Sequence, residues 1–246
     1  MATLTGMNWA LVVPMANEEP DFKPFVDALR IALDKIGSGT VYFIVDNVSK
    51  DRTAELCREL TASDRRFMTV WAPENKNVVD AYLRGYKEAL KNGHDYILEM
   101  DAGLSHDPVF LPDFLSLLKE GFQCVFGSRF MKGGSMGDSP ANRRNLSKFG
   151  TLLSNFLLGS KLHDMTSGYQ GFDSDTVKQF TSYHLKSKAH FYQTELRYLL
   201  RKRKQKEVPI TYKAPSPSVS RKAILNSIET LLYYFFRRIT FRAVSL

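Results

Sequence analysis

Short apolar segments alternate with helical patterns through the first half of the chain, and this alternation most constrains the fold. The apolar segments are three to five residues long, and between them hydrophobic residues recur every three to four positions. The pattern predicts an α/β fold with a mixed, mostly parallel sheet flanked by helices, whose strand-end loops are available to ligands. The predicted strands are 9–13, 41–45, 67–71, 96–100, 124–126 and, further on, 207–212, and the predicted helices are 24–36, 53–60, 78–92 and 111–120.

The composition fits one sizeable domain with anionic partners. The chain has 246 residues, of which 43% are hydrophobic, so it can bury a large core. A net charge of +8 and a pI near 9.4 favour partners such as phosphates or anionic lipids. We expect no nucleic-acid partner, because the chain lacks aromatic-basic binding motifs. Cys57 and Cys124 have no second Cys at metal-ligand spacing, so we expect reduced packing residues.

The predicted strand 96–100 ends abruptly in acids, glycine and proline, which is unusual for a buried strand. Glu99, Asp101 and Asp107 lie in it or directly after it. Ligands bind outside the carboxyl ends of the strands in open α/β sheets, so carboxylates there can hold a metal or a phosphate-bearing ligand through one. An ordinary strand-to-loop exit is the alternative.

Polar groups also follow the first two predicted strands, in Pro14–Glu19 and Asp46–Thr53. Together with Glu99–Pro108, these segments resemble the inverting family 2 glycosyltransferases of the Rossmann-like GT-A fold, specifically the dolichyl- or polyprenyl-phosphate mannose synthase-like branch. The resemblance extends from about Ala10 to Tyr212, and it rests on the order of seven motifs. The later four motifs are Phe126–Phe130, Arg143 with Ser147, Asp164–Phe172, and Gln193–Glu195 taken together with Glu207–Ile210.

The resemblance implies a nucleotide-sugar site at the first strand ends. Pro14, Asn17 and Glu18 would shape the base and ribose pocket, and Asp46 would accept a hydrogen bond from a ring N–H of the base. Asp101 would bind a Mg²⁺ or Mn²⁺ ion that bridges the donor diphosphate. A plain turn at Asp46 and a helix N-terminal charge at Glu18 are the alternatives.

The motif around Asp101 departs from the family at the metal site. Relatives usually have Asp-x-Asp, whereas Gly103 stands in the second acidic position here and Ser105 follows. A hydroxyl is a weaker ligand for a hard cation than a carboxylate, so metal affinity or dependence is in question. Residues two apart on a strand point to one face, so we expect Asp101 to be the main, catalytic ligand, with Glu99 or Asp107 assisting directly or through water.

The resemblance also implies an acceptor site. Arg129, Arg143 and Ser147 match positions that face the acceptor phosphate in the polyprenyl-phosphate branch, and Ser167 lies in a further motif expected on the acceptor side. Arginine binds phosphate with two hydrogen bonds, and Ser147 lies one helical turn after Arg143, although a solvated basic helix start gives the same pattern. Asp164 is either a general base for a hydroxyl acceptor or a carboxylate that orders its loop. A phosphate acceptor is already ionised near neutral pH, so Asp164 ranks below Arg129 among the expected catalytic residues.

Two helical patterns in the C-terminal half, 142–158 and 224–239, are amphipathic and flanked by basic residues. They predict helices that lie in a membrane interface with basic side chains near lipid phosphates, and core or oligomer helices are the alternatives. No segment reaches the roughly 18 apolar residues of a span, and Met1–Gly6 lacks a signal-peptide pattern. We therefore expect a cytoplasmic protein, peripheral on the cytosolic face of a membrane, of undetermined oligomeric state.

The resemblance divides the chain at about residue 212. Residues 1–212 would form the GT-A domain, with a nucleotide-sugar half to about 126 and an acceptor half at 127–212, and 213–246 would form a loop, which is a candidate to close over the donor, and an amphipathic helix. The implied reaction moves a hexose, with inversion, from a nucleotide sugar, GDP-mannose favoured, to a polyprenyl or dolichyl phosphate. A UDP-sugar donor with a glycan or small hydroxyl acceptor, and a non-catalytic nucleotide-sugar-binding module, are the alternatives.

Overall fold

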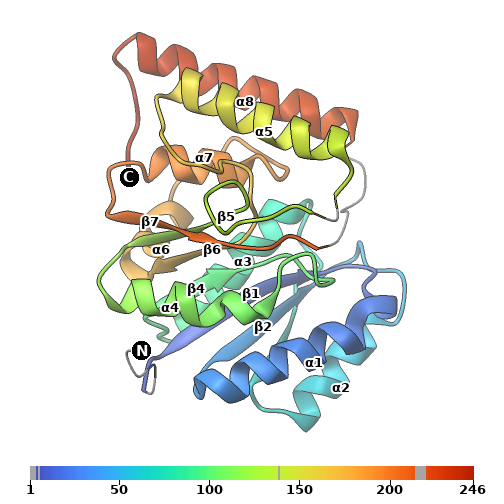
Figure 1. Ribbon diagram of the computed structural model, residues 1–246. Coiled ribbons are helices and arrows are strands. Elements are labelled where there is room, and N and C mark those ends of the chain that lie inside the picture. The colour runs from blue at the N-terminus through green and yellow to red at the C-terminus, as the bar shows by residue number, and fades with distance from the viewer. Residues whose placement is uncertain (1–3, 5, 138, 214–219) are drawn as a thin grey trace.

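The computed structural model describes residues 4, 6–137, 139–213 and 220–246, and in this part of the chain seven strands form one sheet in the order β3-β2-β1-β4-β6-β5-β7 (Figure 1). Strand β6 runs antiparallel to both of its neighbours, whereas the other pairs are parallel. The mixed, mostly parallel sheet expected from the sequence is therefore confirmed. The strands are β1 (Trp9–Met15), β2 (Thr40–Val45), β3 (Phe67–Trp71), β4 (Tyr96–Glu99), β5 (Cys124–Ser128), β6 (Gln170–Asp173) and β7 (Gln205–Pro209).

Helices cover both faces of the sheet. One face is covered by α1, α2 and α4, and the other by α3, α6 and α7, while α5 and α8 lie side by side at one end of the molecule (Figure 1). Arg238 joins these two end helices, because its Nη1 donates to the carbonyl of Leu157 at 2.9 Å. The helices are α1 (Glu19–Ile36), α2 (Thr53–Ser63), α3 (Val78–Lys91), α4 (Leu111–Lys119), α5 (Ala141–Leu158), α6 (Ser174–Thr181), α7 (Tyr192–Leu199) and α8 (Arg221–Ile239).

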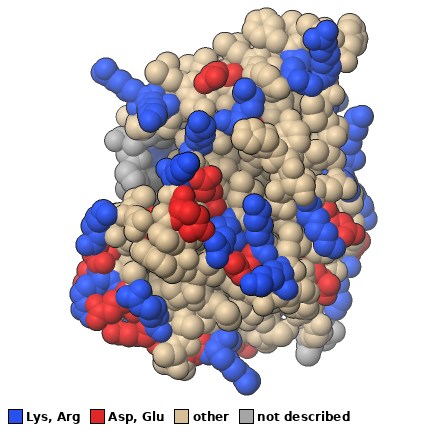
Figure 2. All heavy atoms as spheres, turned by 180° about the vertical axis from the view of Figure 1, so that it is seen from behind, with Lys and Arg blue, Asp and Glu red and all other residues tan. Residues whose placement is uncertain are grey.

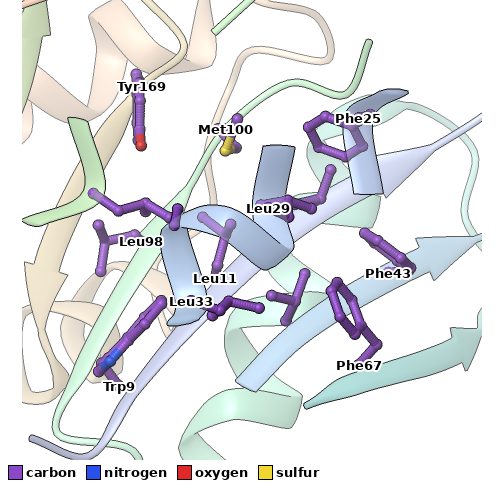
Figure 3. Packing of buried hydrophobic residues seen from close by; sticks show 14 of the residues in the cluster. Trp9, Leu11, Phe25, Leu29, Leu33, Phe43, Phe67, Leu98, Met100 and Tyr169 are labelled. Carbon is purple, nitrogen blue, oxygen red and sulfur yellow. The ribbon is translucent and has the colours of Figure 1, made fainter. Parts of the chain in front are cut away.

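The central strands are apolar along their whole length because both of their faces are buried. On β1, Trp9, Leu11 and Val13 point into the core beneath α1, whereas Ala10 and Val12 point into the core beneath α3. Figure 3 shows the first of these cores, in which side chains from the sheet meet those of α1. The two cores fix the sheet between its helices and so hold its edges in place.

Gly85 lets α3 approach β1 closely. A Cβ atom on this residue would lie 2.2 Å from Cγ1 of Val12. Since that distance is far inside van der Waals contact, the helix can sit this close to the sheet only with a glycine at this position. The packing positions the first turns of α3 beside the end of β4.

Most of the predicted elements are confirmed. Helix α6 was not predicted, α1 begins at Glu19 rather than at residue 24, and two strands differ from the prediction. The prediction omitted β6, which is only four residues long and begins with the polar residue Gln170. The last strand is Gln205–Pro209 rather than 207–212, because Thr211 and Tyr212 form only isolated bridges to other segments. Short strands with polar ends carry too little periodicity to be recognised from sequence.

The two amphipathic patterns of the C-terminal half are the helices α5 and α8, and both leave large apolar side chains exposed. Within the described residues, no helix combines the length and the apolar character that a bilayer crossing needs. The expected domain boundary near Tyr212 stays a prediction. The loop proposed to close over the donor falls mainly on residues 214–219, outside the described residues.

Candidate active site

The predicted site residues gather at the edge of the sheet where β1, β2 and β4 end. From β1 the chain proceeds outward to β2 and β3 on one side, while β4 lies on its other side. At such a switch point the strand-end loops diverge and leave a crevice for ligands. Because β6 runs in the opposite direction, the loop that precedes it also reaches this edge. Donor-side and acceptor-side segments therefore meet in one place.

Asp101 lies directly beyond β4 at the centre of this edge, and its side chain is 30% exposed. The Tyr82 hydroxyl donates to Oδ1 at 2.6 Å, and Nδ1 of His106 lies 3.5 Å from Oδ2. Burial acts to raise the pKa of this carboxyl, but His106, His190 and the Tyr82 hydrogen bond more than offset it, so the pKa is lowered. Asp101 is thus an ionised, accessible carboxylate, as a ligand to a cation must be.

Glu99 lies on the same face as Asp101 but one step deeper. Its buried position argues against the direct metal contact expected as one alternative, while assistance through water stays a prediction. Its side chain is 0% exposed and accepts three hydrogen bonds, from Tyr86 at 2.7 Å, from Gln170 at 2.8 Å and from Tyr192. Burial raises the pKa of Glu99 to about 8. The alternation of the strand was interpreted correctly, but the two-residue step of roughly 7 Å carries Glu99 away from the edge and into the core.

Asp107, the other expected helper, is also engaged elsewhere. Its Oδ1 accepts the backbone N–H of Val109 at 3.0 Å, and its Oδ2 forms an ion pair with Lys213. It begins the short helix η1 (Pro108–Phe110) and ties this loop to the segment after β7. Among the described residues, no group of three or more His, Cys, Asp or Glu side chains is placed to hold a metal by itself.

Glu18 occupies the space beside Gly103, the position at which the family resemblance led us to expect a second acid. Gly103 has φ +73°, and a Cβ atom on it would lie 3.0 Å from Oε2 of Glu18. Burial raises the pKa of Glu18 to about 7, and the nearby charges of Asp21 and Asp101 contribute to the rise. The Glu18 carboxylate therefore faces the motif that contains Asp101.

Asn17 fixes the loop after β1 against the loop after β2. It adopts φ +58°, a left-handed conformation that Asn tolerates better than most residues. Its backbone N–H donates to Oγ of Ser49 at 3.2 Å, and its Oδ1 accepts the N–H of Lys50 at 2.9 Å. The exposed Asn17 side chain thus orders the expected base pocket.

Asp46 and Pro14 lie at the ends of neighbouring strands on this edge. Asp46 is 8% exposed, and its Oδ1 accepts the N–H of Val48 at 2.9 Å, which is the plain-turn interaction expected as the alternative. Its carboxylate still has acceptor capacity for a base N–H. Pro14 is half-buried and pairs with Ile44 of β2. Both residues lie together at this edge, and their binding roles stay predictions.

Arg129 and Asp164 form a buried ion pair. Nε and Nη2 of Arg129 donate to the two carboxylate oxygens at 2.7 and 2.9 Å, and Nη2 also donates to Thr166 Oγ1 at 2.6 Å. Asp164 further accepts the backbone N–H groups of Arg129 and Thr166 at 3.1 and 2.9 Å. The guanidinium lies 5.2 Å from the ring centroid of Phe130 and 5.6 Å from that of Tyr212. Asp164 therefore orders its loop and orients Arg129, which is the second of its two expected roles.

Helix α5, which carries the acceptor candidates Arg143 and Ser147, is joined to this loop at Thr151. Thr151 of α5 accepts the backbone N–H of Met165 on Oγ1 at 3.2 Å, which joins the helix to the loop before β6. Arg143 and Ser147 lie at the start of α5, and both are half-buried. Ser167 is 1% exposed, so its hydroxyl is less accessible than a phosphate-binding group would be.

Sequence reasoning missed several residues that surround the carboxylates. Tyr82 and Tyr192 stack at a centroid distance of 5.3 Å and hydrogen-bond to Asp101 and Glu99, respectively. Gln193 belongs to a motif identified in the sequence, and its Nε2 and Oδ2 of Asp101 lie 2.7 and 2.9 Å from one point, the Cβ position of Gly168. A helical tyrosine carries no local signal for such a role, because the partner carboxylate is distant in sequence. Asp51 is the missed residue that the sequence could have indicated, because it is an acid shortly after the predicted strand that became β2. Its carboxylate accepts hydrogen bonds from Thr53 and from the backbone N–H of Glu19.

The family model for "Glycosyl transferase family 2" matches residues 10–181. The chain belongs to this family. As a family 2 member it is an inverting glycosyltransferase. It is 29% identical over 203 residues to the undecaprenyl-phosphate mannosyltransferase of Micrococcus luteus, with 82% of each chain covered. It is 30% identical over 224 residues to the polyprenol monophosphomannose synthase of Mycolicibacterium smegmatis, with 90% of this chain and 83% of that one covered.

Solved structures support the GT-A fold of this family 2 glycosyltransferase. Glucosyl-3-phosphoglycerate synthase from Mycobacterium tuberculosis, in complex with UDP, superposes with a TM-score of 0.67 at 18% identity, over 94% of this chain and 81% of that one. The same enzyme in complex with Mn²⁺, UDP-glucose and phosphoglyceric acid gives 0.68 at 16% identity, over 96% and 81%. At these identities the similarity establishes the fold.

Proposed function

We propose that this enzyme transfers a hexose, with inversion, from a nucleotide sugar to a polyprenyl or dolichyl phosphate at the cytosolic face of a membrane. The arrangement of α5 carries the proposal. Thr151 joins α5 to the loop that orients Arg129, and Ser147 and Arg143 lie one and about two turns before it, while the helix also exposes apolar side chains. A phosphate attached to a hydrocarbon tail suits this combination of a cationic end and an apolar face. The acceptors named for the two curated relatives support the same class.

The donor site is proposed at the ends of β1, β2 and β4. Asp46 would accept a hydrogen bond from the base, Pro14 and Asn17 would shape its pocket, and Asp101 would face the diphosphate. GDP-mannose is the favoured donor, since both named relatives are mannose transferases. The same fold serves other nucleotide sugars, so a direct comparison of donors is part of the test.

The chain's own residues suit a reaction that needs no general base. The acceptor phosphate is already ionised and can attack the anomeric carbon from the face opposite the leaving diphosphate. Arg143 and Ser147 would hold that phosphate through forked and single hydrogen bonds. Arg129, whose Nε and Nη2 donate to Asp164, would contribute its positive charge nearby. Asp164 remains paired with Arg129 and takes no proton.

A Mg²⁺ or Mn²⁺ ion fits the ionised, accessible carboxylate of Asp101, which would hold it. When bound, the metal stabilises the negative charge that develops on the departing nucleoside diphosphate. Tyr82 keeps the Asp101 carboxylate oriented toward the edge through its 2.6 Å hydrogen bond.

The proposed membrane surface is formed by α5 and α8. In Figure 2 most acidic side chains lie in the middle and lower parts of the molecule, and in the upper part, where acid is sparse, basic side chains lie among uncharged ones. Basic residues near an anionic leaflet contribute on the order of 1 kcal/mol each. The exposed apolar residues are Leu146, Phe149, Leu152, Leu153 and Phe156 on α5 and Ile224, Leu225, Ile228, Leu232, Phe236 and Ile239 on α8.

A donor and acceptor panel tests the reaction. The purified enzyme is offered GDP-mannose, UDP-glucose and UDP-N-acetylglucosamine, with and without a short polyprenyl phosphate, and release of GDP or UDP is followed. We expect release to depend on the lipid phosphate, and Arg143→Ala to raise the KM for it more than the KM for the donor. Release at an equal rate without the lipid phosphate would refute the acceptor assignment.

A vesicle-binding assay tests the surface. The double variant Leu152→Asp/Phe156→Asp is compared with Ile31→Asp, which changes an equally apolar side chain, 58% exposed, on the distant helix α1. Burial of one large apolar side chain contributes about 1.5–3 kcal/mol, so the double variant should bind phosphatidylcholine–phosphatidylserine vesicles at least about tenfold more weakly. Ile31→Asp should bind like the unmodified protein. Equal binding of all three proteins would exclude this surface.

A further inference from the structure

We propose that Glu18 supplies the second protein carboxylate of the divalent-cation site, in place of the acid that the motif lacks at Gly103, and that the donor diphosphate completes the site. This inference rests on the proposed nucleotide-sugar donor. It assigns to Glu18 a ligand role in place of the ribose contact expected from the sequence.

The first observation is the position of the Glu18 carboxylate. Its Oε2 lies 3.0 Å from the point where a Cβ atom of residue 103 would stand. A side chain at 103 would begin at that point and extend toward the region that Glu18 already occupies. The carboxylate of Glu18, in the loop after β1, therefore occupies the space that a side chain at position 103, in the loop after β4, would enter.

The second observation is that the backbone of Glu18 is held while its carboxylate is not. Its N–H donates to Oγ1 of Thr53 at 2.8 Å, and the next N–H, of Glu19, donates to Oδ2 of Asp51 at 3.0 Å. Within the described part of the chain, the Glu18 carboxylate makes no hydrogen bond or ion pair. A fixed backbone with an uncommitted carboxylate is the arrangement that a ligand residue needs.

The third observation is independent of the acidic residues. Gln193 is 2% exposed, and its Nε2 has no hydrogen-bond partner among the described residues. This atom lies 2.7 Å from the Cβ position of Gly168, and Oδ2 of Asp101 lies 2.9 Å from the same position. Nε2 of His106, a residue that is 1% exposed, also lacks a hydrogen-bond partner there. Buried polar groups are normally satisfied, so these groups around Asp101 indicate that a polar ligand binds against them.

The number of ligands determines how the site should behave. Mg²⁺ usually keeps several waters and is bound by one or two carboxylates together with substrate phosphates. Glu18 and Asp101 supply two hard oxygen ligands, and no complete protein cage exists within the described residues. The bare ion should therefore bind weakly, and the nucleoside diphosphate should increase its affinity. By linkage, the ion increases the affinity for the nucleotide by the same factor.

Calorimetric titration of Mn²⁺, with and without saturating GDP or UDP, tests the inference on the intact chain. Glu18→Gln removes the proposed ligand, Glu18→Asp keeps a shorter carboxylate, and Asp21→Asn, at an exposed position in the first turn of α1, removes a neighbouring charge as the control. Loss of even an indirect metal contact typically costs 10–100-fold in affinity, so Glu18→Gln should lower Mn²⁺ affinity with nucleotide at least about tenfold. Glu18→Asp should retain more affinity than Glu18→Gln, and Asp21→Asn should stay close to the unmodified protein.

Nucleotide affinity in the presence of EDTA separates the two roles of Glu18. A metal ligand predicts that Glu18→Gln binds nucleotide in EDTA as the unmodified protein does. An equal loss of nucleotide affinity with and without metal would support the ribose contact and overturn the inference, as would unchanged Mn²⁺ affinity. If neither GDP nor UDP binds the unmodified protein, the donor assignment of the proposed function fails first and the inference fails with it.

Discussion

Replacing Asp164 with Asn should reduce stability strongly while leaving part of the catalytic activity. Asn keeps the shape of the side chain and one carbonyl acceptor but removes the charge that faces Arg129. The carboxylate is 0% exposed and the arginine is 7% exposed, so the variant leaves a buried guanidinium without its counter-ion. Breaking a buried ion pair from one side costs about 3–5 kcal/mol, and we expect a loss in that range at pH 7.

The pH dependence gives a second measure of the same interaction. Burial alone would raise the pKa of Asp164, but the charges of Arg129 and Arg197 and the hydrogen bonds lower it to about 2 from the usual 3.8. A shift of this size corresponds to about 2 kcal/mol. Because the folded-state pKa is depressed, this stabilisation is complete above the unfolded-state pKa and is lost as the pH falls from about 4 through 2. Asp164→Asn should lack this part of the acid destabilisation.

Urea unfolding followed by circular dichroism at pH 7, and at several values between pH 5 and 2, measures both effects. Asp175→Asn is the control, since Asp175 pairs with Lys178 on the surface with a 78% exposed side chain and should change stability little. The double variant Asp164→Asn/Arg129→Met removes both charges and should be more stable than Asp164→Asn. If Asp164→Asn unfolds at the same urea concentration as the unmodified protein and has lost all turnover, Asp164 is a general base and the structural reasoning is wrong.

Three further predictions concern the core. Gly85→Ala should destabilise the protein by about 1–3 kcal/mol, because its Cβ would lie 2.2 Å from Val12; a melting temperature equal to that of the unmodified protein would contradict the close packing of α3. Burial raises the pKa of the Cys57 thiol to about 12, and Cys124 is buried as well. Both cysteines should therefore react with a thiol reagent only as fast as the protein unfolds, and rapid labelling in native buffer would contradict this. The folded-state pKa of Glu99 is raised from 4.5 to about 8, so the stability of the protein should fall as the pH rises between these values. The variant Glu99→Gln should remove this pH dependence of the urea midpoint. An unchanged pH dependence would show that Glu99 is ionised in the folded protein.

The sequence predicted local elements and strand ends well because these depend on nearby residues. The apolar runs of β1 and β2 identify buried strands, and the polar residues after them identify the ligand-binding edge. Depth within the fold was harder to predict. Glu99 and Asp101 share a face as expected, but no local pattern indicates that tyrosines from α3 and α7 enclose the first and leave the second accessible.

Side-chain contacts between segments that are distant in the chain also could not be predicted from the sequence. Arg129 and Asp164 were both identified, yet their ion pair spans 35 positions and depends on β5 lying beside β6. The meeting of Glu18 with Gly103 likewise depends on β1 lying beside β4. The residues were recognised by type, while their partners were set by the order of strands.

The parallel strands of the sheet all end at one edge, and the reversed direction of β6 brings the loop before it to the same edge. The site residues on the strand-end loops lie at this edge. The turns at Gly37, Gly93 and Gly121 lie at the opposite edge of the sheet, before β2, β4 and β5. A reporter peptide inserted at one of these turns would stand a full strand length away from the donor and acceptor. The fold therefore offers attachment points for labels or immobilisation that leave the chemistry untouched.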